Sequence, residues 1–149
     1  MPQEKTFFSA IYFRGIIYTF GGYNAFEKTQ LSDCSYYDTK LDKWYNNKGQ
    51  SFKLHQERSQ CSSCQFEDDT IFIFGGYHRE LGTLSSIERF DVKKKQMIKM
   101  DLLIPQPIRR FASIKISTTK ILLIGGITAQ SNESDAVFCF DLEKEYTIE

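Results

Sequence analysis

The segment Ile71–Gly76 reads Ile-Phe-Ile-Phe-Gly-Gly, and two other segments of the chain have the same form. Ile16–Gly22 reads Ile-Ile-Tyr-Thr-Phe-Gly-Gly, and Ile121–Gly126 reads Ile-Leu-Leu-Ile-Gly-Gly. A short run of β-branched and aromatic residues predicts a buried strand, and glycines permit the positive φ of a sharp departure from it. Because the copies recur at a period of about fifty residues, we expect an internal repeat.

Other features recur at fixed places around each glycine pair. A pair of small residues precedes it, at Ser9-Ala10, Ser62-Ser63 and Ala112-Ser113. An aspartate that follows an aromatic residue comes after it, at Tyr37-Asp38, Phe90-Asp91 and Phe140-Asp141. Trp44, Met97 and Thr147 occupy the next equivalent position. Polar turn residues separate these apolar runs, so each repeat is expected to form four short strands, and the predicted fold class is all-β.

The pattern also predicts how the repeats pack. Small residues in the first strand allow neighbouring sheets to approach one another at an inner edge. Large residues in the fourth strand, such as Trp44 and Met97, are expected to fill a wedge that widens outward. These regularly spaced apolar positions are therefore interpreted as core rather than as a functional site.

Composition narrows the classes of function. The chain has 149 residues, 41% hydrophobic and 26% charged, which is the balance of a globular domain. Its 19 basic and 19 acidic residues cancel, so neither nucleic acid nor an anionic membrane is an expected partner. Four cysteines are too few for a disulfide framework, which favours a reducing, cytoplasmic location. No cofactor and no metal are expected.

The order of these features resembles the kelch repeat, the unit of the kelch and galactose-oxidase-like β-propellers. The features are an apolar strand, a glycine pair, a long loop, an aromatic residue followed by aspartate, and then a tryptophan. The resemblance implies a partial kelch β-propeller of three four-stranded antiparallel blades. Blade 1 is expected at about 5–50, blade 2 at about 54–101 and blade 3 at about 106–149. The residues that carry the repeat are Gly21, Gly22, Asp38, Trp44, Gly75, Gly76, Asp91, Gly125, Gly126 and Asp141.

Three blades are fewer than a closed ring uses, since closed propellers have about four to eight. The chain is therefore expected to be a fragment of a longer propeller, or a half-ring that pairs with another chain. In either case two apolar sheet faces need a cover, so self-association or completion by further kelch repeats is a candidate.

Function is expected at the rim that carries the longer loops, because variable loops on a rigid scaffold are where binding residues gather. The predicted module binds a protein or peptide and is not an enzyme. Its candidate residues are Tyr23, Asn24, Arg58, Tyr77, His78, Arg79, Arg109 and Arg110. Kelch propellers use arginines near this rim to hold acidic peptides, so the resemblance implies the same here; a structural role for the arginines stays open.

Two patterns offer chemistry instead of recognition. Cys61 and Cys64 have the spacing of a redox or zinc motif, but residues three apart on a strand point to opposite faces. His55 and His78 are the only histidines, and both fall in the rim loops of the second repeat. With Glu57, Glu80 or Tyr77 they would be the centre of a kelch-built metalloenzyme, which is the remaining alternative.

Overall fold

We analysed a computed structural model that describes residues 1–46, 52–143 and the backbone of 147 and 148. Every regular element in these ranges is a β-strand, and the prediction of an all-β fold is confirmed. The last residues of the first predicted blade, 47–50, and residues 144–146 and 149 of the third lie outside the described residues.

Three antiparallel sheets of four strands form the blades. Blade 1 consists of β1 (Ser9–Phe13), β2 (Ile16–Phe20), β5 (Cys34–Asp38) and β6 (Lys43–Asn46). Blade 2 consists of β7 (Ser62–Phe66), β8 (Thr70–Phe74), β11 (Ser86–Asp91) and β12 (Gln96–Leu103). Blade 3 consists of β14 (Ala112–Lys115), β15 (Lys120–Ile124), β17 (Val137–Asp141) and β18 (Thr147–Ile148). In each sheet the four strands are neighbours in chain order, which confirms the predicted partial kelch propeller.

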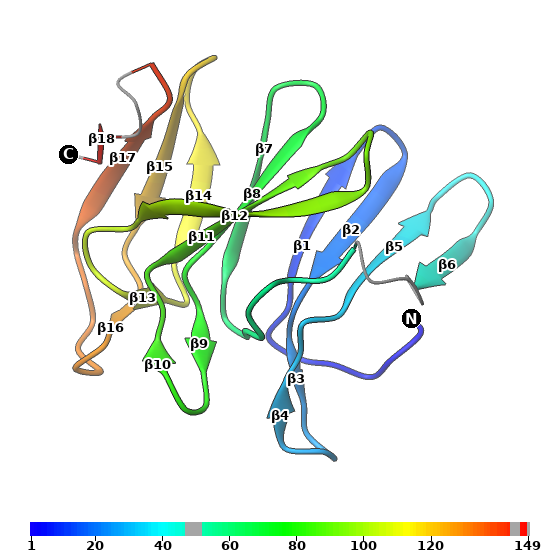
Figure 1. Ribbon diagram of the computed structural model, residues 1–149, viewed down its shortest axis with the longest axis horizontal. Coiled ribbons are helices and arrows are strands. Elements are labelled where there is room, and N and C mark those ends of the chain that lie inside the picture. The colour runs from blue at the N-terminus through cyan, green and yellow to red at the C-terminus, as the bar shows by residue number, and fades with distance from the viewer. Residues whose placement is uncertain (47–51, 144–146, 149) are drawn as a thin grey trace.

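Three small two-stranded ladders lie outside the blades. They pair β3 (Tyr23–Asn24) with β4 (Thr29–Gln30), β9 (Tyr77–His78) with β10 (Gly82–Thr83), and β13 (Ile108–Arg109) with β16 (Ile127–Thr128). All three project from the same edge of the molecule, the lower edge in Figure 1. We call this edge the hairpin rim.

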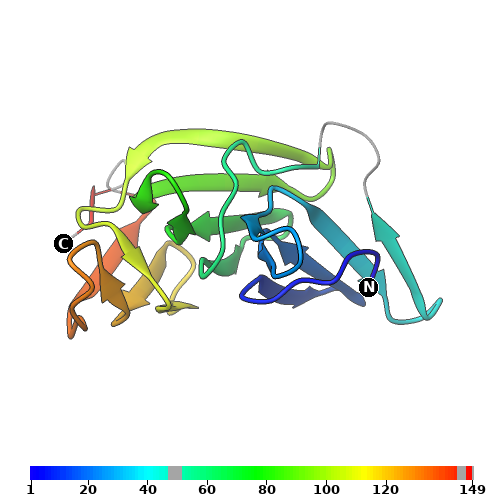
Figure 2. The same ribbon diagram turned by 90° about the horizontal axis from the view of Figure 1, so that it is seen from below.

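The first strands of the blades form the inner edge, as the small residues predict. The Ser9 and Ser63 hydroxyls lie 2.7 Å apart, and so do the Ser62 and Ser113 hydroxyls. These two hydrogen bonds join β1 to β7 and β7 to β14, because side chains this small let the strands come together. Figures 1 and 2 show the result: blades 1 and 3 spread to opposite sides, with blade 2 between them.

The core is divided into two apolar layers, one between each pair of neighbouring blades. The first contains Phe20, Cys34, Phe52 and Phe90, with the Phe52 and Phe90 rings 4.5 Å apart. The second is built from Phe72, Phe74, Ile87, Ile108, Ile121, Leu123 and Phe140. Both sides of blade 2 are thus buried, whereas blades 1 and 3 each bury one side within the described chain.

Met97 and Trp44 occupy equivalent positions but have different surroundings. Met97 is buried in the layer between blades 1 and 2, as predicted. Trp44 is not in such a layer: it packs on Tyr37, with ring centroids 5.2 Å apart, on the side of blade 1 that faces away from blade 2. The prediction that Trp44 fills a wedge between two sheets is therefore not met within this chain, because no described blade covers that side.

The glycine pairs act as the repeat pattern predicts. Gly75 has a φ of 53°, and a Cβ there would lie 2.5 Å from the carbonyl oxygen of Ile108 in the next blade. Gly21 has a φ of 61°, and a Cβ there would collide with the Arg58 carbonyl oxygen. Only glycine accepts both the backbone conformation and the close approach.

The repeat aspartates stabilise the turns after the third strands. Asp38 accepts hydrogen bonds from the N–H groups of Lys40 and Leu41 at 2.9 and 3.0 Å. Asp91 accepts from the N–H of Lys94 at 2.9 Å, and Asp141 accepts from the N–H of Glu143 at 3.1 Å. These carboxylates replace the backbone partners that a tight turn lacks.

Candidate functional site

Two adjacent grooves lie along the hairpin rim. The first runs between the β3–β4 and β9–β10 hairpins and has a volume of about 430 Å³. It is lined by Phe7, Tyr23, Lys28, Gln30, Ser59, Gln60, Tyr77 and Arg79. The second, of about 400 Å³, is lined by Gln60, Tyr77, Gly82, Thr83, Arg109, Arg110, Ala129 and Ser131. Because both include Gln60 and Tyr77, they form one continuous surface, which we call the rim groove.

The rim groove is basic in a chain whose net charge is zero. Lys28, Arg79, Arg109 and Arg110 line it, and none of its lining residues is acidic. A local excess of positive charge on a neutral molecule favours an anionic ligand.

Backbone pairing holds the walls of the groove in place. Tyr23 exchanges backbone hydrogen bonds with Thr6 at 2.8 and 2.9 Å, and Tyr77 does the same with Ser59 at 2.8 and 3.0 Å. Each pair ties a hairpin to the segment that leads into the first strand of its own blade. The tyrosine rings therefore stand on a fixed frame rather than on a free loop.

Arg109 and Arg110 are oriented before any ligand binds. The guanidinium of Arg109 lies 5.1 Å from the Tyr77 ring centroid and donates to the Thr83 hydroxyl at 3.0 Å. Arg110 donates from Nε to the side-chain oxygen of Gln60 at 2.8 Å. Such contacts reduce the rotamer entropy that a bound carboxylate would otherwise have to freeze.

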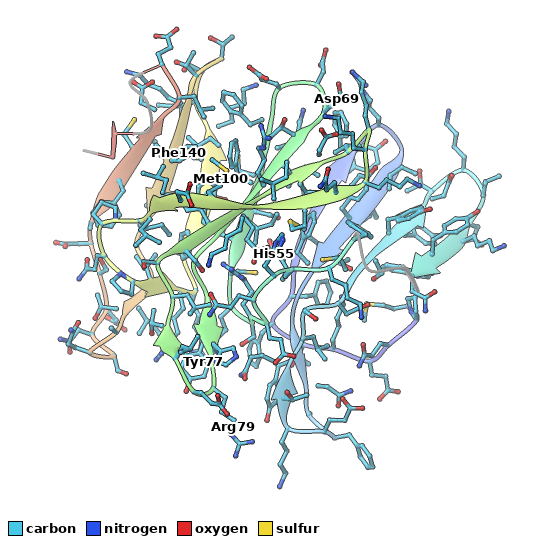
Figure 3. The ribbon with its side chains drawn as sticks, viewed as in Figure 1. His55, Asp69, Tyr77, Arg79, Met100 and Phe140 are labelled. Carbon is cyan, nitrogen blue, oxygen red and sulfur yellow. The ribbon has the colours of Figure 1, made fainter. Side chains whose placement is uncertain are left out.

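Arg79 is exposed, as Arg110 is, whereas Arg109 is half-buried. It lies in the tip of the β9–β10 hairpin, where Figure 3 shows it pointing away from the body of the molecule below Tyr77. Among the described residues, its guanidinium forms one long hydrogen bond, of 3.4 Å from Nη1 to the Lys28 carbonyl oxygen. Most of its donors are therefore available to a partner.

Arg58, by contrast, is a buried structural residue, and its prediction as a partner-binding group needs correction. Its side chain is 0% exposed and forms a 2.7 Å ion pair with Glu88, which is 1% exposed. It also donates to the carbonyl oxygens of Gly75 and Ser86 at 2.9 and 3.1 Å. The guanidinium turns inward because the buried carboxylate of Glu88 compensates its charge. The side chain therefore has no exposed surface to offer a ligand.

Asn24 and His78 lie beside the rim groove but use their side chains within their own hairpins. The Asn24 side-chain oxygen accepts from the N–H groups of Phe26 and Glu27 at 2.9 and 3.0 Å. Nδ1 of His78 accepts from the N–H groups of Glu80 and Leu81 at 3.2 and 3.3 Å. Both residues therefore shape the hairpins that present the groove, and neither lines it.

The two histidines are brought to one cavity, as the sequence suggested. His55 and His78 both line a pocket of about 420 Å³ that also includes Glu57 and Glu88. Nδ1 of His55 is 3.0 Å from a Glu88 carboxylate oxygen, and Glu88 is already paired with Arg58. No group of three or more potential metal ligands occurs among the described residues.

Cys61 and Cys64 face different layers of the core, as their spacing on a strand predicts. Cys61 packs against the layer between blades 1 and 2, and Cys64 lies in the layer between blades 2 and 3. Both are free thiols, and burial raises the pKa of each. A shared metal or a disulfide between them is excluded by this arrangement.

Sequence reasoning missed Phe7 and Gln60 as groove residues. Each stands two residues before the small pair of its repeat, as Arg110 does in blade 3. All three have positive φ, at 55°, 58° and 54°. An alignment of the repeats on their small pairs would have identified this position, because it places Phe7 and Gln60 at the same point as the predicted Arg110.

The described chain contains no helix that is both long and apolar enough to span a membrane.

Comparison with known proteins agrees with the architecture. The chain matches the family described as the KLHDC2/KLHL20/DRC7 Kelch-repeats domain over residues 7–148. Beta-scruin of Limulus polyphemus is 25% identical over 153 residues, which cover 95% of this chain and 16% of the relative. Alpha-scruin of the same organism is 26% identical over 151 residues, with the same coverage. The chain thus spans 16% of the length of these curated relatives. Since the family match extends over nearly the whole chain, this protein belongs to the kelch-repeat family.

Proposed function

We propose that this kelch-repeat domain is a protein-interaction module, and that it binds an acidic segment of its partner in the rim groove. The observation that carries the proposal is the lining of the groove: four basic side chains, two tyrosines and no acidic residue. Tyrosine and arginine are the residue types that dominate binding energy in protein interfaces.

The grooves suit an extended peptide better than a small molecule. They are continuous across the three blades, and their walls are short two-stranded ladders on a rigid scaffold. Arg109 and Arg110 present guanidinium groups toward carboxylates in the second groove, while Tyr23 and Tyr77 offer flat apolar surface in the first.

The proposal is for binding rather than catalysis, because the titratable side chains of the rim groove are arginine, lysine and tyrosine. None of these is paired with a general base in the groove. We further propose a cytoplasmic location, supported by the four cysteines, all of which are free thiols.

The test is fluorescence anisotropy with a labelled Asp/Glu-rich peptide. A second peptide, in which Asn and Gln replace every Asp and Glu, serves as the uncharged control. We expect the acidic peptide alone to bind, with affinity that falls as salt rises, because exposed charges are screened. Equal binding of both peptides, or of neither, would contradict the proposal.

A triple charge reversal locates the site. R79E/R109E/R110E is expected to weaken binding at least about tenfold, since three rim charges together contribute roughly 1.5–3 kcal/mol. The matched control is K93E/K94E/K95E, which makes the same change in net charge in an exposed turn of blade 2, away from the groove residues. Similar losses in both variants would show that binding depends on net charge alone.

A further inference from the structure

The two junctions between blades use the same backbone hydrogen bonds. At each junction, the segment leading into a blade, here called its lead-in segment, lies on the hairpin rim of the blade before it. In junction 1 the bonds are Leu54 N–H to Ser32 O (3.0 Å), Arg58 N–H to Leu31 O (3.2 Å), Gly22 N–H to Arg58 O (2.8 Å) and Gln60 N–H to Phe7 O (2.7 Å). In junction 2 they are Ile104 N–H to Ser85 O (2.8 Å), Ile108 N–H to Leu84 O (3.1 Å), Gly76 N–H to Ile108 O (2.9 Å) and Arg110 N–H to Gln60 O (2.9 Å).

The free side of blade 3 has the same set of groups without partners. They are the N–H of Gly126 and the carbonyl oxygens of Ser134, Asp135 and Arg110, none of which bonds to another described residue in this way. Gly125 has a φ of 67°, like Gly21 and Gly75. A Cβ on Gly125 would meet only the Ser134 carbonyl oxygen, at 3.5 Å, so space for an incoming carbonyl oxygen is present.

Blade 1 has a lead-in segment of the matching form. Met1–Lys5 reads Met-Pro-Gln-Glu-Lys, residues 54–58 read Leu-His-Gln-Glu-Arg, and residues 104–108 read Ile-Pro-Gln-Pro-Ile. Leu54 and Ile104, the first residues of the two docked segments, are 4% and 2% exposed, whereas Met1 is 47% exposed. The first lead-in segment therefore has an apolar anchor that no described blade buries.

The inner strands match in the same way. Within the chain, serine meets serine at both junctions. The two remaining positions, one on each free side, are Ala112 on β14 and Ala10 on β1, and both are exposed. If these sides meet each other, methyl faces methyl and no hydroxyl is left without a partner.

We propose that blade 3 of one copy receives Met1–Lys5 and β1 of a second copy, so that two copies close a ring of six blades. Exposed apolar residues on both sides would be buried: Tyr12 is 65% exposed on blade 1, and Ile114 and Val137 are 52% exposed on blade 3. The lead-in segment and blade 3 lie at opposite ends of the fan in Figure 1, and a head-to-tail contact made twice closes on a two-fold axis. This proposal does not rest on peptide binding in the rim groove.

The first test is native mass spectrometry of the purified chain across the micromolar range. The proposal predicts a species of twice 17.4 kDa. A single chain at every concentration would overturn it, and so would an open series of larger assemblies, because those would mean that the contact does not close.

The variant Ala112→Arg tests whether the free side of blade 3 is the surface that contacts the second copy. Since Ala112 is exposed in the single chain, the variant should fold as before but give only the 17.4 kDa species. Thr118→Arg is the control: it adds the same side chain at an exposed turn outside the proposed junction, and it should leave the two-copy species unchanged. Persistence of that species in the Ala112→Arg variant would place the contact elsewhere and overturn the proposal.

Disulfide trapping tests the register. The serine hydroxyls at the equivalent positions are 2.7 Å apart, so the two side chains at such a junction point directly at each other. A mixture of Ala10→Cys and Ala112→Cys chains should therefore form a covalent pair on mild oxidation, and each variant alone should not. Absence of the cross-link in the mixture, or equal cross-linking in the single variants, would contradict the predicted pairing of β14 with β1 of the second copy.

Discussion

At the scale of single residues, Arg58 shows how the repeat assigns one position to different roles. Ile108 stands at the same place in blade 3 and is buried in the core, whereas Arg58 needs Glu88 to compensate its charge. Glu88 also accepts hydrogen bonds from the N–H groups of His55 and Gln56, at 2.8 and 3.3 Å. This buried cluster fixes the lead-in segment of blade 2 against its own sheet.

Removal of either charge should destabilise the protein strongly. We expect Arg58→Ala or Glu88→Ala to lower the free energy of unfolding by about 3–5 kcal/mol, because each leaves an uncompensated buried charge. The double variant should cost less than the sum of the two single variants, as measured by urea denaturation. Arg79→Ala is the exposed comparison, expected within about 1 kcal/mol of wild type. Additive losses at Arg58 and Glu88 would mean that the two side chains do not act as a pair.

The buried cysteines offer a second test at this scale. Cys34 is 0% and Cys64 is 6% exposed, and burial raises the pKa of both thiols. The thiolate fraction at pH 8 is therefore smaller than for a free cysteine, whose pKa is about 8.5. Alkylation followed by peptide mass spectrometry should show both cysteines unmodified in the folded protein and labelled after denaturation. Rapid labelling of Cys34 in the folded protein would contradict the packing of the layer between blades 1 and 2.

At the scale of elements, the strand order could be predicted from the sequence, because β-strand patterning and glycine pairs are local signals repeated three times. Because the same spacing occurs three times, it predicts the same order of four strands in each blade. Exposure is not a local signal, so the positions of Arg58 and Trp44 could not be predicted in the same way. Arg58 is buried beside Ser86 and Glu88 of a later strand, and Trp44 is only half-buried because no described blade packs on its side of blade 1.

The glycine pairs are the element-scale feature most open to measurement. Gly75→Ala combines an unfavourable positive φ with a contact of 2.5 Å from its Cβ to the Ile108 carbonyl oxygen. Gly82→Ala has a φ of 75° but nothing within 4 Å of its Cβ, so it isolates the backbone cost. We expect Gly82→Ala to cost about 1 kcal/mol and Gly75→Ala clearly more, by thermal or urea unfolding. Equal costs would show that the close approach between blades does not matter.

At the scale of the whole molecule, the rim and the blade faces serve separate purposes. Figure 3 shows Tyr77 and Arg79 at the hairpin rim, with Asp69 at the opposite edge and Phe140 inside blade 3. The blade faces bury apolar side chains, while two tyrosines and three arginines gather at the rim groove. Of the predicted binding residues, Tyr23, Tyr77, Arg79, Arg109 and Arg110 line the rim groove. Packing therefore constrains the residues of the strands, whereas the loops at the rim can vary and determine which partner binds.

The most direct measurement of the central claim is an NMR titration of the isotopically labelled protein with the Asp/Glu-rich peptide. Binding in the rim groove predicts that amide shifts change at Gln60, Tyr77, Arg79 and Arg109, while the turn around Asp69 at the opposite edge stays unchanged. Shift changes centred on Asp69, or no saturable change at the rim, would contradict the assignment of the rim groove as the binding site.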